Sequence, residues 1–174
     1  MNIILTDMAL LSIFIVPVVP VQLTITTKEA NETIETLEGE FNLIKYKKLK
    51  NISWSSFFPV NKNYGFIPRG ALLDGWLYVA FLELMQKYRL PIRIIITNRD
   101  KVPVFNSLMS IDTLTYNIDK VGDINYSLTL TEFYEKFVDF LSREKKVLKY
   151  INKENINKQS KILLEKHGLI KNDL

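Results

Sequence analysis

Hydrophobic and polar residues alternate most regularly in VGDINYSLTLTEFYE, residues 121–135. The apolar positions share one parity and are separated by Asn, Ser and Thr; they are Ile124, Tyr126, Leu128 and Leu130. A period of two is typical of a strand that buries one face and leaves the other wet or paired. We therefore predict a half-buried strand here. The pattern alone does not distinguish an enzyme from a binding module or an assembly scaffold.

Several short strands are predicted before the first helix. Apolar and polar residues alternate from Val21 to Ile25, and turn-type residues follow at 28–31 and 38–40. Gly39 is the expected position of positive φ in the second turn. A further strand is predicted around residues 49–58, where SWSSFFP ends in a proline.

Residues 72–89, LLDGWLYVAFLELMQKYR, change to a helical period. Apolar side chains recur three or four residues apart, which predicts one long amphipathic helix. Asp74 is suited to cap its first turn, and Pro91 marks its end.

The next segments predict a buried strand and a long hairpin. PIRIIITN, residues 91–98, has the continuous apolar run of a central strand buried on both faces. In the strand that follows, the apolar parity changes between Ile111 and Leu114, so we expect a bulge near Asp112 and Thr113. The loop at 117–123 then turns the chain back into the strand of residues 121–135.

The first residues of the chain are strongly apolar. MALLSIFIVPVVPV, residues 8–21, is shorter than the roughly 20 residues of a membrane-spanning helix, and Pro17 interrupts it. The residues before it carry Asp7 and no Lys or Arg, which argues against an export signal. We expect an N-terminal arm over residues 1–16, helix or strand, that this domain or a partner covers. We also expect that its deletion leaves the domain folded.

These patterns together predict an α+β fold: a mostly antiparallel sheet or partial barrel, one long packed helix and C-terminal helices. The expected division is an apolar arm at 1–16, an α+β domain at 17–135 and a basic helical extension at 136–174. The extension has apolar residues at helical spacings from Phe137 to Leu148, and a second, shorter helix ends near Gly168.

Composition narrows the classes of function. The 174 residues are 47% hydrophobic and contain no cysteine, so the chain can bury a core but has no disulfide, thiolate metal site or cysteine nucleophile. The net charge of +4 comes from the C-terminus, since residues 143–174 hold nine Lys and Arg against four Asp and Glu. Such a tail is usually a solvated helix face, and a nucleic-acid contact is the alternative.

Catalytic chemistry has little support in the sequence. The one histidine, His167, lies near the C-terminus, and no phosphate-binding, zinc-protease or nucleophile-elbow motif occurs. The glutamates between Glu29 and Glu40 are expected in solvated loops. We therefore expect no enzyme, no catalytic residue, no metal site and no cofactor.

Candidate contact residues come from the aromatic and basic segments. Phe57 and Phe58 are adjacent and cannot both face one core from a regular strand, so one of them is a candidate interface anchor. Burial of both under the following loop is the alternative. The full set of expected protein-interface residues is Phe14, Ile15, Trp54, Phe57, Phe58, Pro59, Lys145, Lys146 and Lys149.

An ordered set of segments resembles a known family. The order PVVPVQLTI, NETIETLEGEFNLI, LKNISWSSFFP, GWLYVAFLELMQKYRLPIRIIITN and VGDINYSLTLTEFYE is similar to the N-terminal domain of LysM-containing baseplate proteins. These belong to contractile phage tails and phage-tail-like bacteriocins (tailocins) of Gram-positive bacteria. The resemblance covers roughly residues 15–135. SSFFP and GDINYSLTLTEF carry it most specifically.

The resemblance implies a structural virion component without enzyme activity. Such a domain fastens the central hub and tube to surrounding wedge and sheath-initiating proteins in a large multi-subunit baseplate. It implies assembly in the bacterial cytoplasm into a tail or tail-like particle released on lysis, with no nucleic-acid or membrane partner. Residues 136–174 lack the Gly-Asp-Thr-Leu signature of LysM, so peptidoglycan binding is not carried over.

Two alternative functions stay open at this stage. One is a peptidoglycan- or glycan-binding module, and the other is a nucleic-acid-binding protein that uses the basic tail. The sequence does not determine copy number, phage versus headless bacteriocin, or which surface meets which partner.

Overall fold

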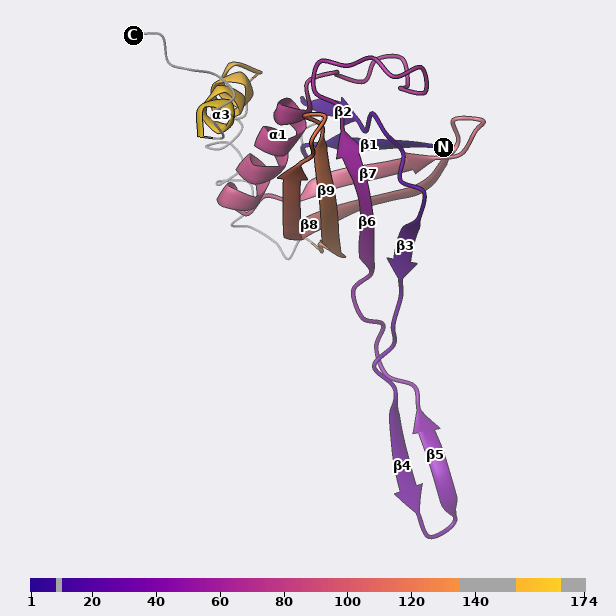
Figure 1. The fold of residues 1–174 in the computed structure, drawn as a ribbon. Coiled ribbons are helices and arrows are strands. Elements are labelled where there is room, and N and C mark those ends of the chain that lie inside the picture. Colours follow the sequence, from indigo (N-terminus) through magenta and orange to yellow (C-terminus); the bar gives the residue numbers. More distant parts are fainter. Residues whose placement is uncertain (9–10, 135–152, 167–174) are drawn as a thin grey trace.

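The computed structural model describes residues 1–8, 11–134 and 153–166, and its centre is an open antiparallel sheet of seven strands (Figure 1). The strand order is β2-β1-β7-β8-β9-β6-β3, so β2 and β3 are the two edges. The α+β class expected from the sequence is confirmed, with an open sheet. The strands are β1 Asn2–Thr6, β2 Ile13–Ile15, β3 Leu23–Thr26, β6 Asn51–Phe58, β7 Ile92–Thr97, β8 Pro103–Ile118 and β9 Ile124–Glu132.

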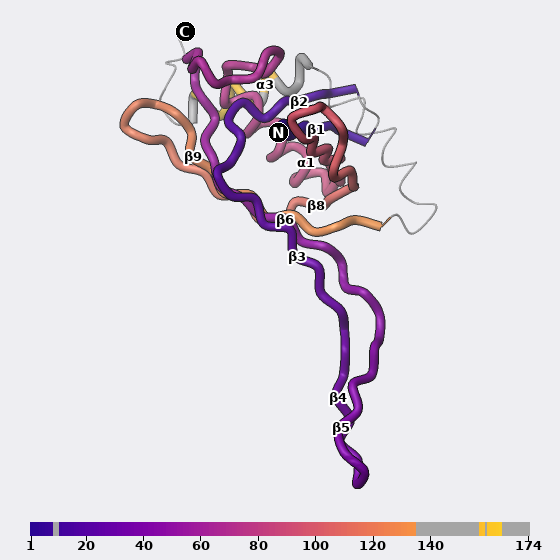
Figure 2. The backbone as a smooth tube through the Cα atoms, turned by 90° about the vertical axis from the view of Figure 1, so that its right-hand side faces the viewer, coloured from indigo at the N-terminus to yellow at the C-terminus, as the bar shows by residue number. Residues whose placement is uncertain are grey.

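A separate two-stranded hairpin lies between β3 and β6 in the sequence. It consists of β4, Glu32–Thr36, and β5, Gly39–Leu43. The turn uses Gly39 at a φ of 129°, which confirms the expected positive-φ position. The hairpin projects away from the sheet and helices on two connecting segments (Figures 1 and 2).

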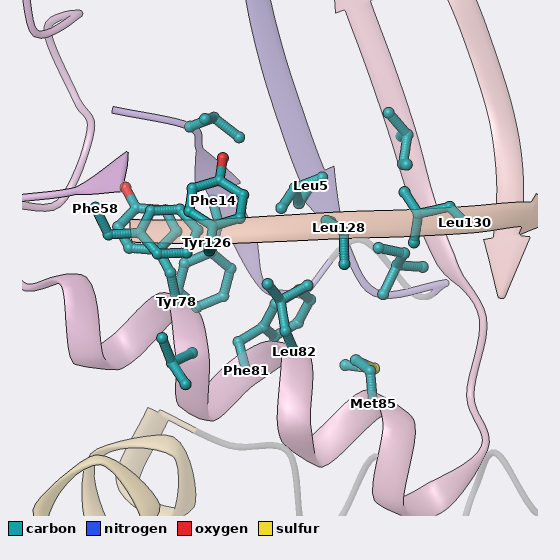
Figure 3. Packing of buried hydrophobic residues seen from close by; sticks show 14 of the residues in the cluster. Leu5, Phe14, Phe58, Tyr78, Phe81, Leu82, Met85, Tyr126, Leu128 and Leu130 are labelled. Atoms are coloured by element: carbon teal, nitrogen blue, oxygen red, sulfur yellow. The ribbon is translucent and has the colours of Figure 1, made fainter. Parts of the chain in front are cut away.

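One face of the sheet is covered by helix α1, Gly75–Tyr88, and the core lies between them (Figure 3). The side chains that meet there come from α1 and from strands at both ends of the sheet; among them are Leu5, Phe14, Phe58, Tyr78, Phe81, Leu82, Met85, Tyr126, Leu128 and Leu130. Among the described residues, helices cover only one face of the sheet, so these residues leave the other face for solvent or for a partner.

The ends of α1 follow the sequence signals. The amide of Trp76 donates to Asp74 Oδ1 at 3.0 Å, so Asp74 is the N-cap as expected. Arg89 adopts a left-handed conformation, with a φ of 54°, at the C-cap just before Pro91. At Gly75 an added Cβ would lie 2.9 Å from Phe58 Cβ, so only glycine lets the helix approach β6 this closely.

The long hairpin of β8 and β9 confirms both the alternation and the bulge. The register shifts between Ile111 and Thr113, which places Leu114 and Tyr116 on the core side together with Ile111. In β9 the four apolar residues of the opening pattern are all buried. The expected burial of 91–98 on both faces was wrong in part, because Arg93 and Ile95 on the face away from α1 are only half-buried.

Residues 1–16 are part of the body and form no separate arm. β1 pairs with both β2 and β7, and the buried side chains from this segment include Ile3, Leu5, Phe14 and Val16. The sequence left helix or strand open for this segment, and the structure has strands. Of the two covers considered, this domain or a partner, the domain itself buries the apolar side chains. Because the segment supplies core side chains, the structure favours no boundary at residue 16, and it favours unfolding on deletion of 1–16 over the folded product expected from the sequence.

Helix α3, Lys153–Lys166, packs on α1 on the side away from the sheet. Leu163 is buried and contributes to the core cluster, and Leu164 packs against it. This agrees with the helix expected in the C-terminal extension. The other helix expected there lies outside the described residues, as do His167 and Gly168.

Candidate interaction surface

The β4–β5 hairpin exposes an apolar face. Paired residues of two antiparallel strands project to the same side, and Ile34 pairs with Phe41 while Leu43 pairs with Glu32. Ile34, Phe41 and Leu43 remain 42%, 53% and 46% exposed. Every residue from 31 to 49 is classed as exposed, so no described part of this chain covers that face. An isolated two-stranded hairpin is only marginally stable in water, so an apolar face of this kind favours a partner.

The opposite face of the hairpin is acidic. Glu35 and Glu40 are directly opposite each other across the strands, which is unfavourable for two like charges. Residues 31–43 contain four glutamates and no Lys or Arg, and one of the four, Glu32, projects to the apolar side opposite Leu43. Glu32 forms an ion pair with Lys45 nearer the body, where the lysines of this ribbon gather. The distal hairpin is therefore a negatively charged ribbon.

Backbone hydrogen bonds join the two segments that connect the hairpin to the sheet. The amide of Lys48 donates to the carbonyl of Lys28 at 2.8 Å, and the amide of Ala30 donates to the carbonyl of Tyr46 at 2.9 Å. β3 and β6 continue the same pairing into the sheet. The hairpin thus extends the β3 side of the sheet as one continuous ribbon.

The outer face of the sheet, away from α1, divides into two halves of different chemistry. On the β2-β1-β7 half, Ile15, Ile4 and Ile95 stand in one cross-strand row. Ile13 lies in the next row with Thr6 and Arg93, and it is 62% exposed. We call Ile4, Ile13, Ile15 and Ile95 the isoleucine stripe. It lies at the free β2 edge, so it is a second apolar surface open to a partner.

On the β8-β9-β6-β3 half, the outer face carries hydroxyl and amide side chains. Ser55 pairs with Ser127, which in turn pairs with Thr115, and the two serine hydroxyls are 3.1 Å apart. Two shallow hollows of about 510 and 570 Å³ lie on this surface and share Ser55, Ser56, Phe57 and Ser127 in their linings. Neither hollow is lined by a charged side chain.

Of the six expected contact residues that the structure describes, four are buried within the chain. Phe14, Trp54 and Phe58 are only 6%, 4% and 0% exposed, and Pro59 is also buried. Trp54 Nε1 donates to the hydroxyl of Tyr126 at 3.0 Å, and the Phe58 ring stacks on the Tyr126 ring at 3.9 Å. These four side chains are thus packed within the body, which leaves them little surface for the partner contact expected from the sequence.

The other expected contact residues have mixed outcomes. Ile15 is half-buried in the isoleucine stripe. Phe57 is half-buried on the outer face, where its ring meets those of Tyr64 and Phe66 edge to face. One phenylalanine of the pair thus faces outward and the other faces the core. Lys145, Lys146 and Lys149 lie outside the described residues.

A buried carboxylate fastens the loop after β6 to the turn between β8 and β9. Asp123 accepts hydrogen bonds from the Val60 amide at 3.1 Å, Lys62 Nζ at 3.3 Å and the Tyr64 hydroxyl at 2.5 Å. Burial alone would raise the pKa of Asp123, but these hydrogen bonds lower it below its ordinary value. Tyr64 shows the reciprocal effect, since its hydrogen bond to the carboxylate raises its pKa. With its hydrogen bonds satisfied, this cluster has a structural role.

The described residues contain neither a metal-binding cluster nor a membrane-spanning helix. Across the residues that the structure describes, no group of three or more His, Cys, Asp or Glu side chains could hold a metal ion. Within the same residues, no helix has the length and apolar character needed to span a membrane.

The Tyr116 hydroxyl is a titratable group at the edge of the core. Burial and a 2.8 Å hydrogen bond to Glu83 raise its pKa to about 12.

No protein-family model and no curated protein matches the chain. Solved structures of similar shape come from tailed particles. A chain of the virion of a native gene transfer agent particle has a TM-score of 0.46 and 12% identity, over 77% of this chain and 92% of that chain. A chain of the tail of an empty gene transfer agent particle has a TM-score of 0.45 and 14% identity, over 79% and 95%. A chain of the PVC extracellular contractile injection system, from its sheath/tube terminator, has a TM-score of 0.39 and 11% identity, over 76% and 90%. At these scores and identities the likeness assigns no function.

The hairpin residues were missed as contact candidates although their signal was present. The segment NETIETLEGEFNL alternates apolar and polar residues on both sides of its turn, as residues 121–135 do. That alternation predicts two strands but not which layer covers their apolar face. The isoleucine stripe was missed because Ile95 follows the other three residues by 80 to 91 positions in the sequence.

Proposed function

We propose that this chain is a structural adaptor in the baseplate of a contractile tail or tail-like bacteriocin. In this role it fastens the central hub and tube to surrounding wedge and sheath-initiating proteins. The observation that carries the proposal is the projecting β4–β5 hairpin, whose apolar face is uncovered in the described chain. An adaptor has to reach a neighbouring subunit and bury apolar surface there, and this ribbon has the shape and the chemistry for both.

The sequence resemblance is the reason for proposing a contractile tail or tail-like bacteriocin as the particle. Its most specific segments correspond to structural elements of the body: SSFFP ends β6, and GDINYSLTLTEF spans β9. These segments build the core that supports the hairpin. The resemblance and the uncovered hairpin therefore support the same role.

The first test is to ask whether the chain is present in tail-like particles. Particles induced from the source strain are sedimented through a density gradient and analysed by quantitative mass spectrometry. We expect the chain to co-migrate with tube and sheath proteins at a low, fixed ratio to the sheath. Its absence from intact particles would refute the proposal.

A variant pair tests the hairpin within the same particles. Ile34→Ser with Phe41→Ser removes apolar side chains that are exposed, so the body should fold as before. Val121→Ser is the control, because Val121 is also an exposed apolar residue, at 65%, but lies in the turn between β8 and β9. We expect loss of the chain from particles with the hairpin variant only. Equal incorporation of both variants would show that the hairpin is not the fastening element.

Glycan binding is the second candidate, and the uncharged hydroxyl and amide face favours it. Neutral polysaccharides are bound through many such hydrogen bonds, and Phe57 adds a ring beside the hollows. The test is co-sedimentation with purified peptidoglycan, comparing the unaltered chain with Ser55→Arg and Ser127→Arg. Binding that both variants abolish would favour this function, and no pelleting of the unaltered chain would dismiss it.

A further inference from the structure

We infer that the uncovered hairpin binds a second copy of this chain, on the isoleucine stripe at the β2 edge. This inference rests on the proposed role as an assembly component and names the partner of its hairpin. It predicts a head-to-tail contact in which one copy supplies the ribbon and the next copy supplies the sheet edge.

The two surfaces match in chemistry. The hairpin presents Ile34, Phe41 and Leu43 on one face, and the stripe presents Ile4, Ile13, Ile15 and Ile95. Each is an apolar patch that its own chain leaves open or half-open. Their contact would bury both patches and would cover the unpaired edge of β2, which is otherwise a liability for uncontrolled pairing.

The charges also match. The hairpin segment 31–43 carries four glutamates, whereas the stripe is bordered by Arg93 in β7 and by Arg99 and Lys101 in the turn after it. Two acids lie nearby. Asp100 is between Arg99 and Lys101 in that turn, so the three basic residues keep an excess of positive charge over it, and the carboxylate of Asp7 in the β1–β2 connection is occupied by the amides of Leu11 and Ser12 at 2.9 and 3.1 Å. Glu35 and Glu40 project from the face of the hairpin that would point away from the stripe. Because a two-stranded ribbon is thin, they would still lie within about one Debye length, about 8 Å, of the sheet surface, so their attraction to its basic residues would not be fully screened. The contact is thus electrostatically attractive.

The fold keeps the two surfaces apart within one copy. The hairpin leaves the sheet between β3 and β6, at one end of the strand order, and β2 is the other end. Figure 1 shows the hairpin and β2 on opposite sides of the body. Each copy therefore has one free ribbon and one free edge. A contact between two different surfaces of identical chains is heterologous, and it produces a closed ring when the rotation closes or a filament when it does not.

Complementation between two variants tests the inference. Phe41→Asp disables the ribbon, and Ile13→Asp disables the edge; both side chains are exposed, so neither change should unfold the body. We expect the unaltered chain to form rings or larger oligomers in sedimentation velocity, and each variant alone to be monomeric. A mixture of the two variants should form a dimer and nothing larger, because only one of the two possible contacts is intact in each pair. Val121→Asp, in the β8–β9 turn, is the control and should assemble like the unaltered chain.

Three results would overturn the inference. One is an unaltered chain that stays monomeric up to about 1 mM, which limits any contact to roughly 4 kcal/mol. Another is assembly that neither variant weakens. The last is variants that are each monomeric but do not combine when mixed, since a heterologous contact requires complementation. If any of these occurs while the chain still co-migrates with particles, the adaptor role stands and the hairpin has a different partner.

Discussion

The chain contains two hairpins in which apolar and polar residues alternate, but the apolar side chains are buried in one and exposed in the other. In β8–β9 the apolar parity of β9 is buried against α1, whereas in β4–β5 the apolar parity stays exposed. Both are antiparallel and both turn at a glycine of positive φ, Gly122 in the first and Gly39 in the second. The difference is the layer above them, since α1 covers one and no described residue covers the other. Alternation therefore encodes a face to be covered, and the cover can come from within the chain or from another subunit.

The largest effect should come from removing residues 1–16. Deletion takes away β1 and β2 and with them four buried apolar side chains, each contributing about 1.5–3 kcal/mol of burial. That loss is comparable with the whole stability of a domain, about 5–15 kcal/mol, so the β8–β9 hairpin should lose its packed core too. We expect a chain without a cooperative thermal transition by circular dichroism. A folded deletion product would show that the second half of the sheet is sufficient, and a full-length sample is the control.

Truncating a buried side chain of the β8–β9 hairpin should have the next largest effect on stability. Leu128→Ala in β9 leaves a cavity in the core and should lower the free energy of unfolding by about 2–5 kcal/mol. Thr129→Ala, one residue along on the outer face, should change it by no more than about 0.5 kcal/mol. Urea denaturation of both variants measures the difference. Similar values for the two would mean that β9 does not bury the face described above.

The buried carboxylate beneath the β8–β9 turn should have an intermediate effect that depends on pH. Asp123→Asn weakens the hydrogen bonds from Val60, Lys62 and Tyr64 and should cost about 1–3 kcal/mol at neutral pH. Because folding lowers the pKa of Asp123, its charge stabilises the native state above the ordinary carboxyl pKa of 3.8, and this is lost as pH falls through the lowered value. The gap between variant and unaltered protein should therefore narrow in acid. Denaturation series at pH 7 and below pH 4 would reveal it, and a constant gap would contradict the charged cluster.

The smallest effect is expected in the uncovered hairpin. Phe41→Ala should change the stability of the monomer by no more than about 0.5 kcal/mol, because the ring is exposed and packs on no core. The measurement is denaturation at a concentration low enough to keep the chain monomeric, since self-association would add stability. A loss as large as that for Leu128→Ala would show that the hairpin is covered within its own chain, and it would remove the contrast between the two hairpins.

Local signals in the sequence predicted most elements because they act over a few residues. Asp74 and Pro91 bounded α1, the parity change at Asp112 predicted the bulge in β8, and Gly39 marked the turn of β4–β5. The candidate contact residues were predicted less well. Trp54 and Phe58 have the large apolar side chains of interface anchors and of core residues alike, and only the position of α1 assigned them to the core.

By itself the sequence determined the strand and helix segments, the absence of cysteine chemistry and the faces that must be covered, since periodicity and composition are properties of neighbouring residues. Only the tertiary structure decided that Ile4, Ile13 and Ile95 form one stripe, because strands distant in the sequence become neighbours through backbone pairing. It also decided that residues 1–16 join the core while 31–43 project from it. The physical reason is that α1 is one helix on a seven-stranded sheet, so it covers one face, and the described residues leave the remaining apolar surface uncovered.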